Sequence, residues 1–205
     1  MLDPLMRRLI DPPLKGVASI LPRQLSANRI TIGGFILGVC CFVAIAIGSM
    51  TAALVFLLLN RLADGLDGAV ARRDTPSELG GYLDIVADFV LWSLLPLGFI
   101  ILDSGNAVAA AVLLSAFSMS MTVFLAFAIM AEKRGLETDT QGRKSFFYMA
   151  GLAEGTETIV FFVVVMIWPG FFIPAAFIYA AIVYLSVIGR VATSYTALQN
   201  LKTDA

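Results

Sequence analysis

The chain contains no histidine, so the most common general base and the most common zinc ligand are absent from its chemistry. Its two cysteines, Cys40 and Cys41, are adjacent within an apolar run, so a disulfide framework is not expected. Charged residues make up only 14% of the 205 residues, and the formal net charge of -1 gives no sign of nucleic-acid binding. Any chemistry must therefore depend on carboxylates, lysine, arginine and hydroxyl groups.

Long apolar runs dominate the rest of the sequence, which is 59% hydrophobic and has a mean hydropathy of +0.89. A soluble domain of this length has more charge and less apolar content. About 20 apolar residues are needed to cross roughly 30 Å of hydrocarbon, and six runs reach that length. The sequence therefore predicts an all-α integral membrane protein with six transmembrane helices. The runs cover about residues 30–49, 51–72, 79–102, 105–131, 145–168 and 171–197.

The connections between these runs alternate in charge. Segments 48–51, 102–106 and 168–171 are short and contain no lysine or arginine. The basic residues lie in or near the N-terminal segment, the two remaining connections and the C-terminus. By the positive-inside rule, both ends of the chain are predicted to be cytoplasmic.

The first 25 residues do not resemble a signal peptide, because prolines and basic residues interrupt any compact apolar region. We expect an amphipathic helix on the membrane surface, broken by prolines such as Pro12 and Pro13, with a frayed tail as the alternative. No soluble domain or internal repeat is visible, so one membrane domain is predicted for residues 1–205. Its parts would be a cytoplasmic surface segment 1–28, a six-helix core 30–197 and a cytoplasmic tail 198–205.

Four aspartates interrupt the second and third apolar runs, where burial of charge is most costly. Their spacing of three or four residues places them in one stripe on each helix. The short turn between the runs makes the two helices antiparallel neighbours, so the four carboxylates should converge. Gly65 and Gly68 lie beside the first stripe and would let another group approach the backbone. The stripes consist of Asn60, Asp64, Asp67 and Ala71 on the first helix and Gly80, Asp84 and Asp88 on the second.

Converging carboxylates repel one another unless a cation lies between them. Without histidine or a suitable cysteine, these hard oxygen ligands predict Mg²⁺, Mn²⁺ or Ca²⁺ rather than Zn²⁺. Mg²⁺ commonly shares its shell with substrate phosphates, and the nearby Arg72 and Arg73 suit a phosphorylated ligand. The pattern predicts phosphoryl-type chemistry at the cytoplasmic membrane surface. Two alternatives are ion pairs of the carboxylates with Arg61 or Arg72, and proton carriage in a transporter.

The segments DGLDGAVAR and GGYLDIVAD resemble the signature of the CDP-alcohol phosphatidyltransferases, Asp-x-x-Asp-Gly-x-x-Ala-Arg followed by Gly-x-x-x-Asp-x-x-x-Asp. Every fixed residue is present, although the spacer has seven residues where eight are expected in many members. ANRIT (27–31) is similar to the Asn-x-x-Thr entry to the first span, and GRKS (142–145) is similar to a Gly-x-x-Lys-Thr stretch before the fifth. The signature positions are Asp64, Asp67, Gly68, Ala71, Arg72, Gly80, Asp84 and Asp88.

This resemblance implies transfer of a phosphatidyl-type group from a CDP-linked lipid, most often CDP-diacylglycerol, to the hydroxyl of a small polar alcohol. CMP is released, and the reaction belongs to phospholipid biosynthesis. The resemblance further implies a bacterial inner (plasma) membrane location and a homodimer. The positions of the basic segments and of the aspartates predict an active site that faces the cytoplasm. The apolar runs imply contact with membrane lipids, and no nucleic-acid partner is expected.

The resemblance also assigns roles to residues. Asp64, Asp67 and Asp84 would hold two divalent ions, Mg²⁺ or Mn²⁺, while Asp88 would share a metal contact and act as general base. The nucleotide-binding residues that it implies are Asn28, Thr31, Asn60, Gly68, Ala71, Arg72 and Gly80.

Charged residues later in the chain are candidates for the acceptor site. Glu154 and Glu157 lie on the fifth predicted span, Lys144 precedes it, and Arg190 lies near the inner end of the sixth. The cations would suit a phosphorylated acceptor such as glycerol 3-phosphate or an inositol phosphate. The glutamates would suit an amine or a polyol, or would pair with Arg61 or Arg190. The sequence leaves these alternatives open.

A cation- or proton-coupled membrane transporter that uses the same carboxylates is the main alternative function. The sequence shows neither paired half-helix breaks nor an internal repeat, which argues against it. An intramembrane prenyltransferase would have more spans and two well-separated acidic motifs. An intact signature argues against a catalytically silent scaffold.

Overall fold

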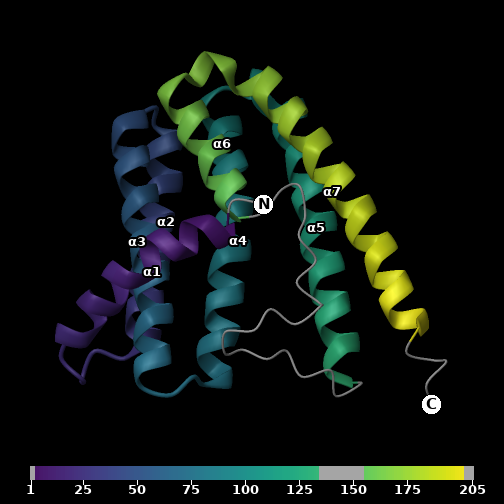
Figure 1. The fold of residues 1–205 in the computed structure, drawn as a ribbon. Coiled ribbons are helices and arrows are strands. Elements are labelled where there is room, and N and C mark those ends of the chain that lie inside the picture. Colours follow the sequence, from purple (N-terminus) through teal and green to yellow (C-terminus); the bar gives the residue numbers. More distant parts are fainter. Residues whose placement is uncertain (1–2, 134–154, 201–205) are drawn as a thin grey trace.

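Helices form all the regular structure in the part of the chain that the computed structural model describes, residues 3–133 and 155–200. This confirms the all-α class (Figure 1). The elements are α1 (Asp3–Ile20), α2 (Ala27–Ala46), α3 (Met50–Arg73), α4 (Glu78–Leu102), the short 3₁₀ helix η1 (Ser104–Asn106), α5 (Ala107–Lys133), α6 (Gly155–Ile167), the 3₁₀ helix η2 (Pro169–Phe171) and α7 (Phe172–Asn200).

Four stretches of helix in the described residues are long and apolar enough to cross a membrane. They are α2, α4, α5 together with η1, and most of α7 together with η2. Helix α3 has 24 residues but also contains the charged signature, and the described part of the fifth predicted span is the 13-residue apolar helix α6. The helices follow the six predicted runs in order, and the number of six membrane crossings stays a prediction.

Helix α1 is continuous over 18 residues and contains Pro12 and Pro13, so the predicted break is wrong. The two prolines are adjacent, which confines the lost backbone hydrogen bonds to one turn of the helix. Beyond them, Leu14 and Ala18 are buried in a small core with residues of α3, and this tertiary packing supports the second half of the helix. Whether α1 lies on a membrane surface stays a prediction.

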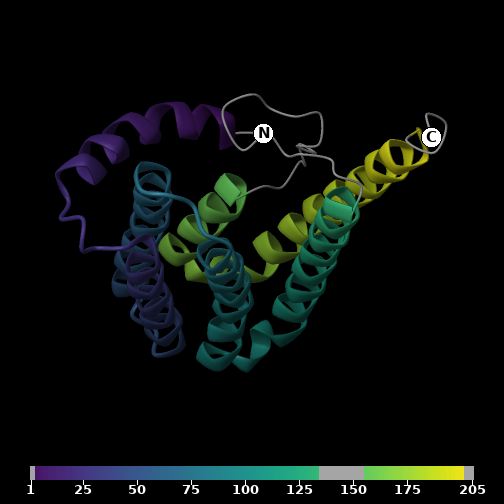
Figure 2. The same ribbon diagram turned by 90° about the horizontal axis from the view of Figure 1, so that it is seen from below.

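The main core contains buried residues of every helix from α2 to α7, and stacked aromatic rings join α4 and α6 to α7 within it. The rings of Phe99 and Phe172 stack with centroids 4.2 Å apart, and those of Phe161 and Tyr179 stack at 4.7 Å. Helices α5 and α7 run side by side and slant away from the α2–α4 group in both views (Figures 1 and 2). The signature therefore lies in the α2–α4 group, away from the outer end of the α5–α7 pair.

Helix α2 packs closely against α3 and α4 through glycines on one face. A Cβ atom on Gly34 would lie 3.1 Å from the Cβ of Ala63, and one on Gly38 would lie 2.9 Å from Cδ1 of Leu91. Small residues four positions apart let helix backbones approach in this way. The close approach brings polar groups at the start of α2 within reach of the signature on α3.

Candidate active site

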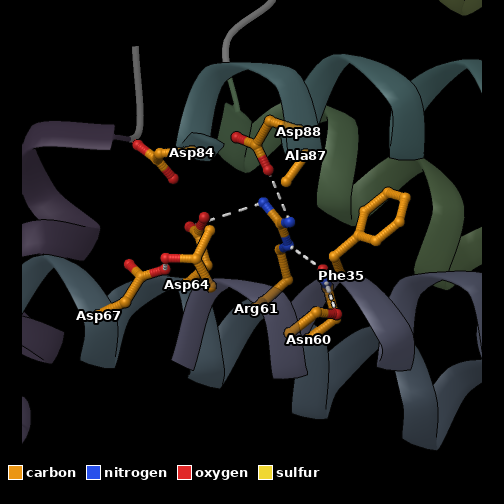
Figure 3. Close-up of a pocket in the computed structure, with 10 residues that line it drawn as sticks. Phe35, Asn60, Arg61, Asp64, Asp67, Asp84, Ala87 and Asp88 are labelled. Carbon is orange, nitrogen blue, oxygen red and sulfur yellow. Dashed lines mark hydrogen bonds and ion pairs between the residues drawn. The ribbon is translucent and has the colours of Figure 1, made fainter. Parts of the chain in front are cut away.

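The four predicted aspartates line one pocket between α2, α3 and α4 (Figure 3). Helices α3 and α4 are consecutive and joined by a short connection, so their acidic stripes face each other as the spacing predicted. Helix α2 contributes a third wall that the aspartate spacing alone did not indicate. The pocket is lined by Thr31, Gly34 and Phe35 of α2, Asn60, Arg61, Asp64 and Asp67 of α3, and Asp84, Ala87 and Asp88 of α4.

Three of the carboxylates form a compact cluster. Asp64, Asp67 and Asp84 each offer one oxygen, and these oxygens all lie within 4.8 Å of one another. Asp67 is buried, whereas Asp84 is exposed, so the cluster extends from the helix interface to the surface of the protein. A set of hard oxygen donors at this separation fits a divalent cation such as Mg²⁺ or Mn²⁺.

The fourth carboxylate, Asp88, is engaged by an arginine instead. Nη2 of Arg61 donates a hydrogen bond of 2.8 Å to Oδ1 of Asp88, and Nη1 of Arg61 lies 3.6 Å from Oδ2 of Asp64. The Arg61 side chain is only 13% exposed, and its Cζ lies 4.9 Å from the ring centroid of Trp92. Within the described residues, Arg61 thus forms ion pairs with Asp64 and Asp88, as the alternative interpretation of the carboxylates predicted.

Arg61 is the site residue that the sequence analysis treated only as a possible ion-pair partner. It precedes Asp64 by three residues on α3, a spacing that puts the two side chains on one face of the helix. That spacing was the available signal. The reach across to Asp88 on α4 required the tertiary structure.

Two polar groups connect α2 to the acidic stripe. Oγ1 of Thr31 lies 2.5 Å from Oδ2 of Asp67 and 3.1 Å from the carbonyl oxygen of Ala27. The hydroxyl has one hydrogen, so the shorter contact to a carboxylate is the stronger bond. Nδ2 of Asn60 donates 2.7 Å to the carbonyl oxygen of Gly34. Both bonds are buried and fix the orientation of groups in the pocket.

The other residues that the signature assigned to a nucleotide lie toward the connection between α3 and α4. Asn28 and Gly80 are adjacent, because a Cβ atom on Gly80 would lie 3.0 Å from Oδ1 of Asn28. Nη1 of Arg72 would lie 3.4 Å from a Cβ on Gly68. None of these four residues lines the pocket, nor does the half-buried Ala71.

Helix α1 fills the space beside Gly65. A Cβ atom on Gly65 would lie 2.6 Å from Cδ1 of Leu14, so the group that approaches this part of α3 is a side chain of α1. At the end of α3, Nη1 of Arg73 donates to the carbonyl oxygens of Ala18 and Leu21, at 2.5 and 3.1 Å. These contacts hold α1 across the end of α3 near the signature (Figure 2).

Two of the four acceptor candidates, Glu157 and Arg190, belong to the described residues. Glu157 is half-buried in the first turn of α6, and Nη1 of Arg190 on α7 lies 3.3 Å from Oγ of Ser120 on α5. Neither lines the pocket. Lys144 and Glu154 lie outside the described residues.

Comparison with known proteins identifies relatives over most of the chain. A family model for CDP-alcohol phosphatidyltransferase matches residues 24–192. The inner membrane protein YnjF of Escherichia coli (strain K12) is 40% identical over 204 residues, 98% of this chain and 99% of that protein. An archaetidylinositol phosphate synthase of Methanothermobacter thermautotrophicus is 37% identical over 86 residues, which are 42% of this chain and 41% of that protein.

A solved structure has the same fold. It is the crystal structure of the Mycobacterium tuberculosis phosphatidylinositol phosphate synthase (PgsA1) with CDP-DAG bound, which is 20% identical to this chain with a TM-score of 0.67. The match covers 92% of this chain and 94% of that chain. Since the family model spans most of the sequence and a relative of similar length shares 40% of it, the chain belongs to the CDP-alcohol phosphatidyltransferase family and is a membrane transferase of phospholipid biosynthesis.

Proposed function

We propose that the protein transfers the phosphatidyl group of CDP-diacylglycerol to the hydroxyl of a small polar alcohol, releases CMP and depends on Mg²⁺ or Mn²⁺. The observation that carries the proposal is the convergence of Asp64, Asp67 and Asp84, whose oxygens lie within 4.8 Å of one another. These residues occupy signature positions of the family that the chain belongs to.

The carboxylates of Asp64, Asp67 and Asp84 would hold the divalent metal, with a shared contact from Asp88, and the family resemblance indicates two ions. Bound metal supplies positive charge to the diphosphate of the donor and offsets the charge that develops on the departing phosphate. Thr31 and its bond to Asp67 fix one member of the set before the substrate arrives.

The nucleotide would lie near the connection between α3 and α4, where glycines leave space for it. Gly68 and Gly80 have no side chain there, and the Arg72 guanidinium beside Gly68 is about half exposed. A guanidinium is well suited to phosphate oxygens because it can donate two parallel hydrogen bonds. Asn28, Ala71 and Asn60 complete the proposed set.

Asp88 would act as the general base. Its carboxylate takes the proton of the acceptor hydroxyl while that oxygen forms a bond to the donor phosphorus. The bond between this phosphorus and the diphosphate bridging oxygen breaks, and CMP leaves with the electron pair. Arg61 bonds Oδ1 of Asp88 and fixes the orientation of the carboxylate, which a positioned base requires.

We place the site at the cytoplasmic face of a bacterial inner membrane, because the basic segments predicted to be cytoplasmic adjoin the signature. A site at this level lets lipid chains stay in the bilayer while the nucleotide and the acceptor reach water. A homodimer is part of the proposal through the family resemblance. The proposed acceptor is a small polar alcohol. The similarity to the archaetidylinositol phosphate synthase favours an inositol phosphate among these alcohols.

The test is CMP formation by the purified protein with CDP-diacylglycerol, Mn²⁺ and a panel of alcohols that includes glycerol 3-phosphate and inositol phosphate. We expect CMP with at least one alcohol, and no CMP under strong chelation. Asp88→Asn should lower the rate about 10²- to 10⁴-fold. The matched control is Asp103→Asn, which changes an exposed aspartate just after α4, outside the pocket, and should leave the rate unchanged.

Activity under chelation would contradict the metal dependence, and a normal rate of Asp88→Asn would contradict the role of the base. Failure with every alcohol, in protein that still binds CDP-diacylglycerol, would contradict the proposed acceptor class.

A further inference from the structure

Arg61 places a positive charge inside the acidic pocket although the family signature starts only at Asp64. We propose that Arg61 is a built-in counter-ion: it pairs with Asp88 and Asp64 and lowers the affinity of the carboxylates in the pocket for a divalent cation. The inference rests on the proposed metal site. It adds a positioning residue that sets how readily the site loads and releases its metal.

The guanidinium is held by groups other than the carboxylates. Its Nε donates a hydrogen bond of 2.7 Å to Oδ1 of Asn60. The side chain of Asn60 is in turn fixed by its hydrogen bond to the carbonyl oxygen of Gly34 on α2. The cation also lies over the ring of Trp92 on α4. A planar guanidinium can make an in-plane hydrogen bond and a stacking contact at once, whereas the compact ammonium of a lysine cannot reproduce this fork. Asn60 and Trp92 therefore hold Arg61 in the pocket independently of its ion pair with Asp88.

The charges in the pocket explain the effect on a cation. Four carboxylates and one guanidinium line it, a formal net charge of -3 when all are ionised. Without Arg61 this charge would be -4. Nη1 of Arg61 lies 3.6 Å from Oδ2 of Asp64, a member of the three-carboxylate cluster, so the guanidinium and a divalent cation compete for the same carboxylate. Because the Arg61 side chain is only 13% exposed, water screens this competition weakly.

The guanidinium of Arg61 also forms an ion pair with Asp88. Its 2.8 Å bond to Nη2 of Arg61 is charge-assisted, and its Oδ1 is thereby turned toward Arg61, away from Asp67 (Figure 3). The pocket thus contains three carboxylates whose oxygens lie close together and a fourth that accepts the hydrogen bond from Arg61. The hydrogen bond from Arg61 thereby orients Asp88.

The experiment measures Mn²⁺ binding to the full-length protein in detergent by calorimetric titration, without lipid substrates. Arg61→Gln removes the positive charge and should tighten Mn²⁺ binding about tenfold. Arg61→Lys keeps the charge and should bind within about threefold of the wild type. The double variant Arg61→Gln/Asp88→Asn restores the net charge of the pocket and should also bind within about threefold. Arg23→Gln, the same change at an exposed arginine outside the pocket, is the control and should bind as the wild type does.

A second readout is thermal unfolding. In chelator, Arg61→Gln should unfold at a lower temperature than the wild type, because four carboxylates then lack a counter-ion, and saturating Mn²⁺ should close that gap. If Arg61→Gln cannot be purified folded, Arg61→Lys and the double variant still decide, since tenfold tighter binding by either one overturns the inference.

The outcomes separate the inference from the function on which it rests. Absence of Mn²⁺ binding by the wild type would overturn the proposed metal site itself. Mn²⁺ binding by the wild type, with Arg61→Gln binding no more tightly, would overturn only the counter-ion role of Arg61.

Discussion

Replacement of Thr31 with valine removes the hydroxyl that lies 2.5 Å from Oδ2 of Asp67 and changes little else, because the two side chains have nearly the same shape. Thr31 is 7% exposed and Asp67 is 5% exposed, so water has little access to replace the lost donor. The carboxylate of Asp67 would then lose the bond that orients it toward the cluster with Asp64 and Asp84.

The magnitude follows from the strength of that bond. Hydrogen bonds to charged groups contribute about 1.5–3 kcal/mol, and each 1.4 kcal/mol is about a factor of ten in an equilibrium constant. Loss of a partner that orients a metal ligand usually costs about 10- to 100-fold in metal affinity or activity. We therefore expect Thr31→Val to raise the Mn²⁺ concentration for half-maximal activity about 10- to 100-fold. Thr31→Ser keeps the hydroxyl and should stay within about threefold.

The assay is the initial rate of CMP release over a series of Mn²⁺ concentrations at saturating CDP-diacylglycerol, with calorimetric Mn²⁺ binding as an independent measurement. An unchanged Mn²⁺ dependence of Thr31→Val would refute the reasoning. If the variant instead raises only the KM for CDP-diacylglycerol, the role of Thr31 would be the nucleotide contact that the family signature implies.

Three further predictions concern the packing around the site. Gly34→Ala should lower the unfolding temperature, because the new Cβ would lie 3.1 Å from that of Ala63 and such overpacking costs about 1–3 kcal/mol. Gly33→Ala is the control, because a Cβ atom on Gly33 would have no neighbour within 4 Å and the change should stabilise the helix by up to about 1 kcal/mol. Equal unfolding temperatures of the two variants would contradict the close contact at Gly34. Arg73→Met removes the donors to the last carbonyls of α1, so hydrogen exchange there should speed up, and unchanged protection would contradict the anchor. The hydrogen bond from Arg73 holds the pKa of Asp74 below its usual range. The pair therefore stabilises the folded connection at every pH above the pKa that Asp74 has in the unfolded chain. This stabilisation is lost only as the pH falls through the lowered pKa of the folded state. Proteolysis of the α3–α4 connection should therefore not change between about pH 8 and pH 5, and an increase in that window would count against the pair.

Local sequence patterns predicted the helices near the signature closely. The runs expected at 51–72 and 79–102 correspond to Met50–Arg73 and Glu78–Leu102. This accuracy has a local cause, since the residues between the runs include Pro76 and the helix-capping Ser77, whose side chain accepts from the Gly80 N–H. In α1 the local pattern failed, because packing of Leu14 against Gly65 on α3 supports a helix that the prolines alone would interrupt.

The sequence by itself determined the family signature and the two acidic stripes, because helical periodicity decides which residues share a face and the short connection makes the two helices neighbours. Only the tertiary structure decided how the carboxylates divide. The contact of Thr31 with Asp67 joins residues 36 apart in the chain, and that of Arg61 with Asp88 joins residues 27 apart. Such contacts depend on the distance and the axial rotation between packed helices, which are set by glycines such as Gly34 and Gly38. Spacing along one helix specifies neither quantity, so the α2 wall and the role of Arg61 became visible only when the helices were packed together.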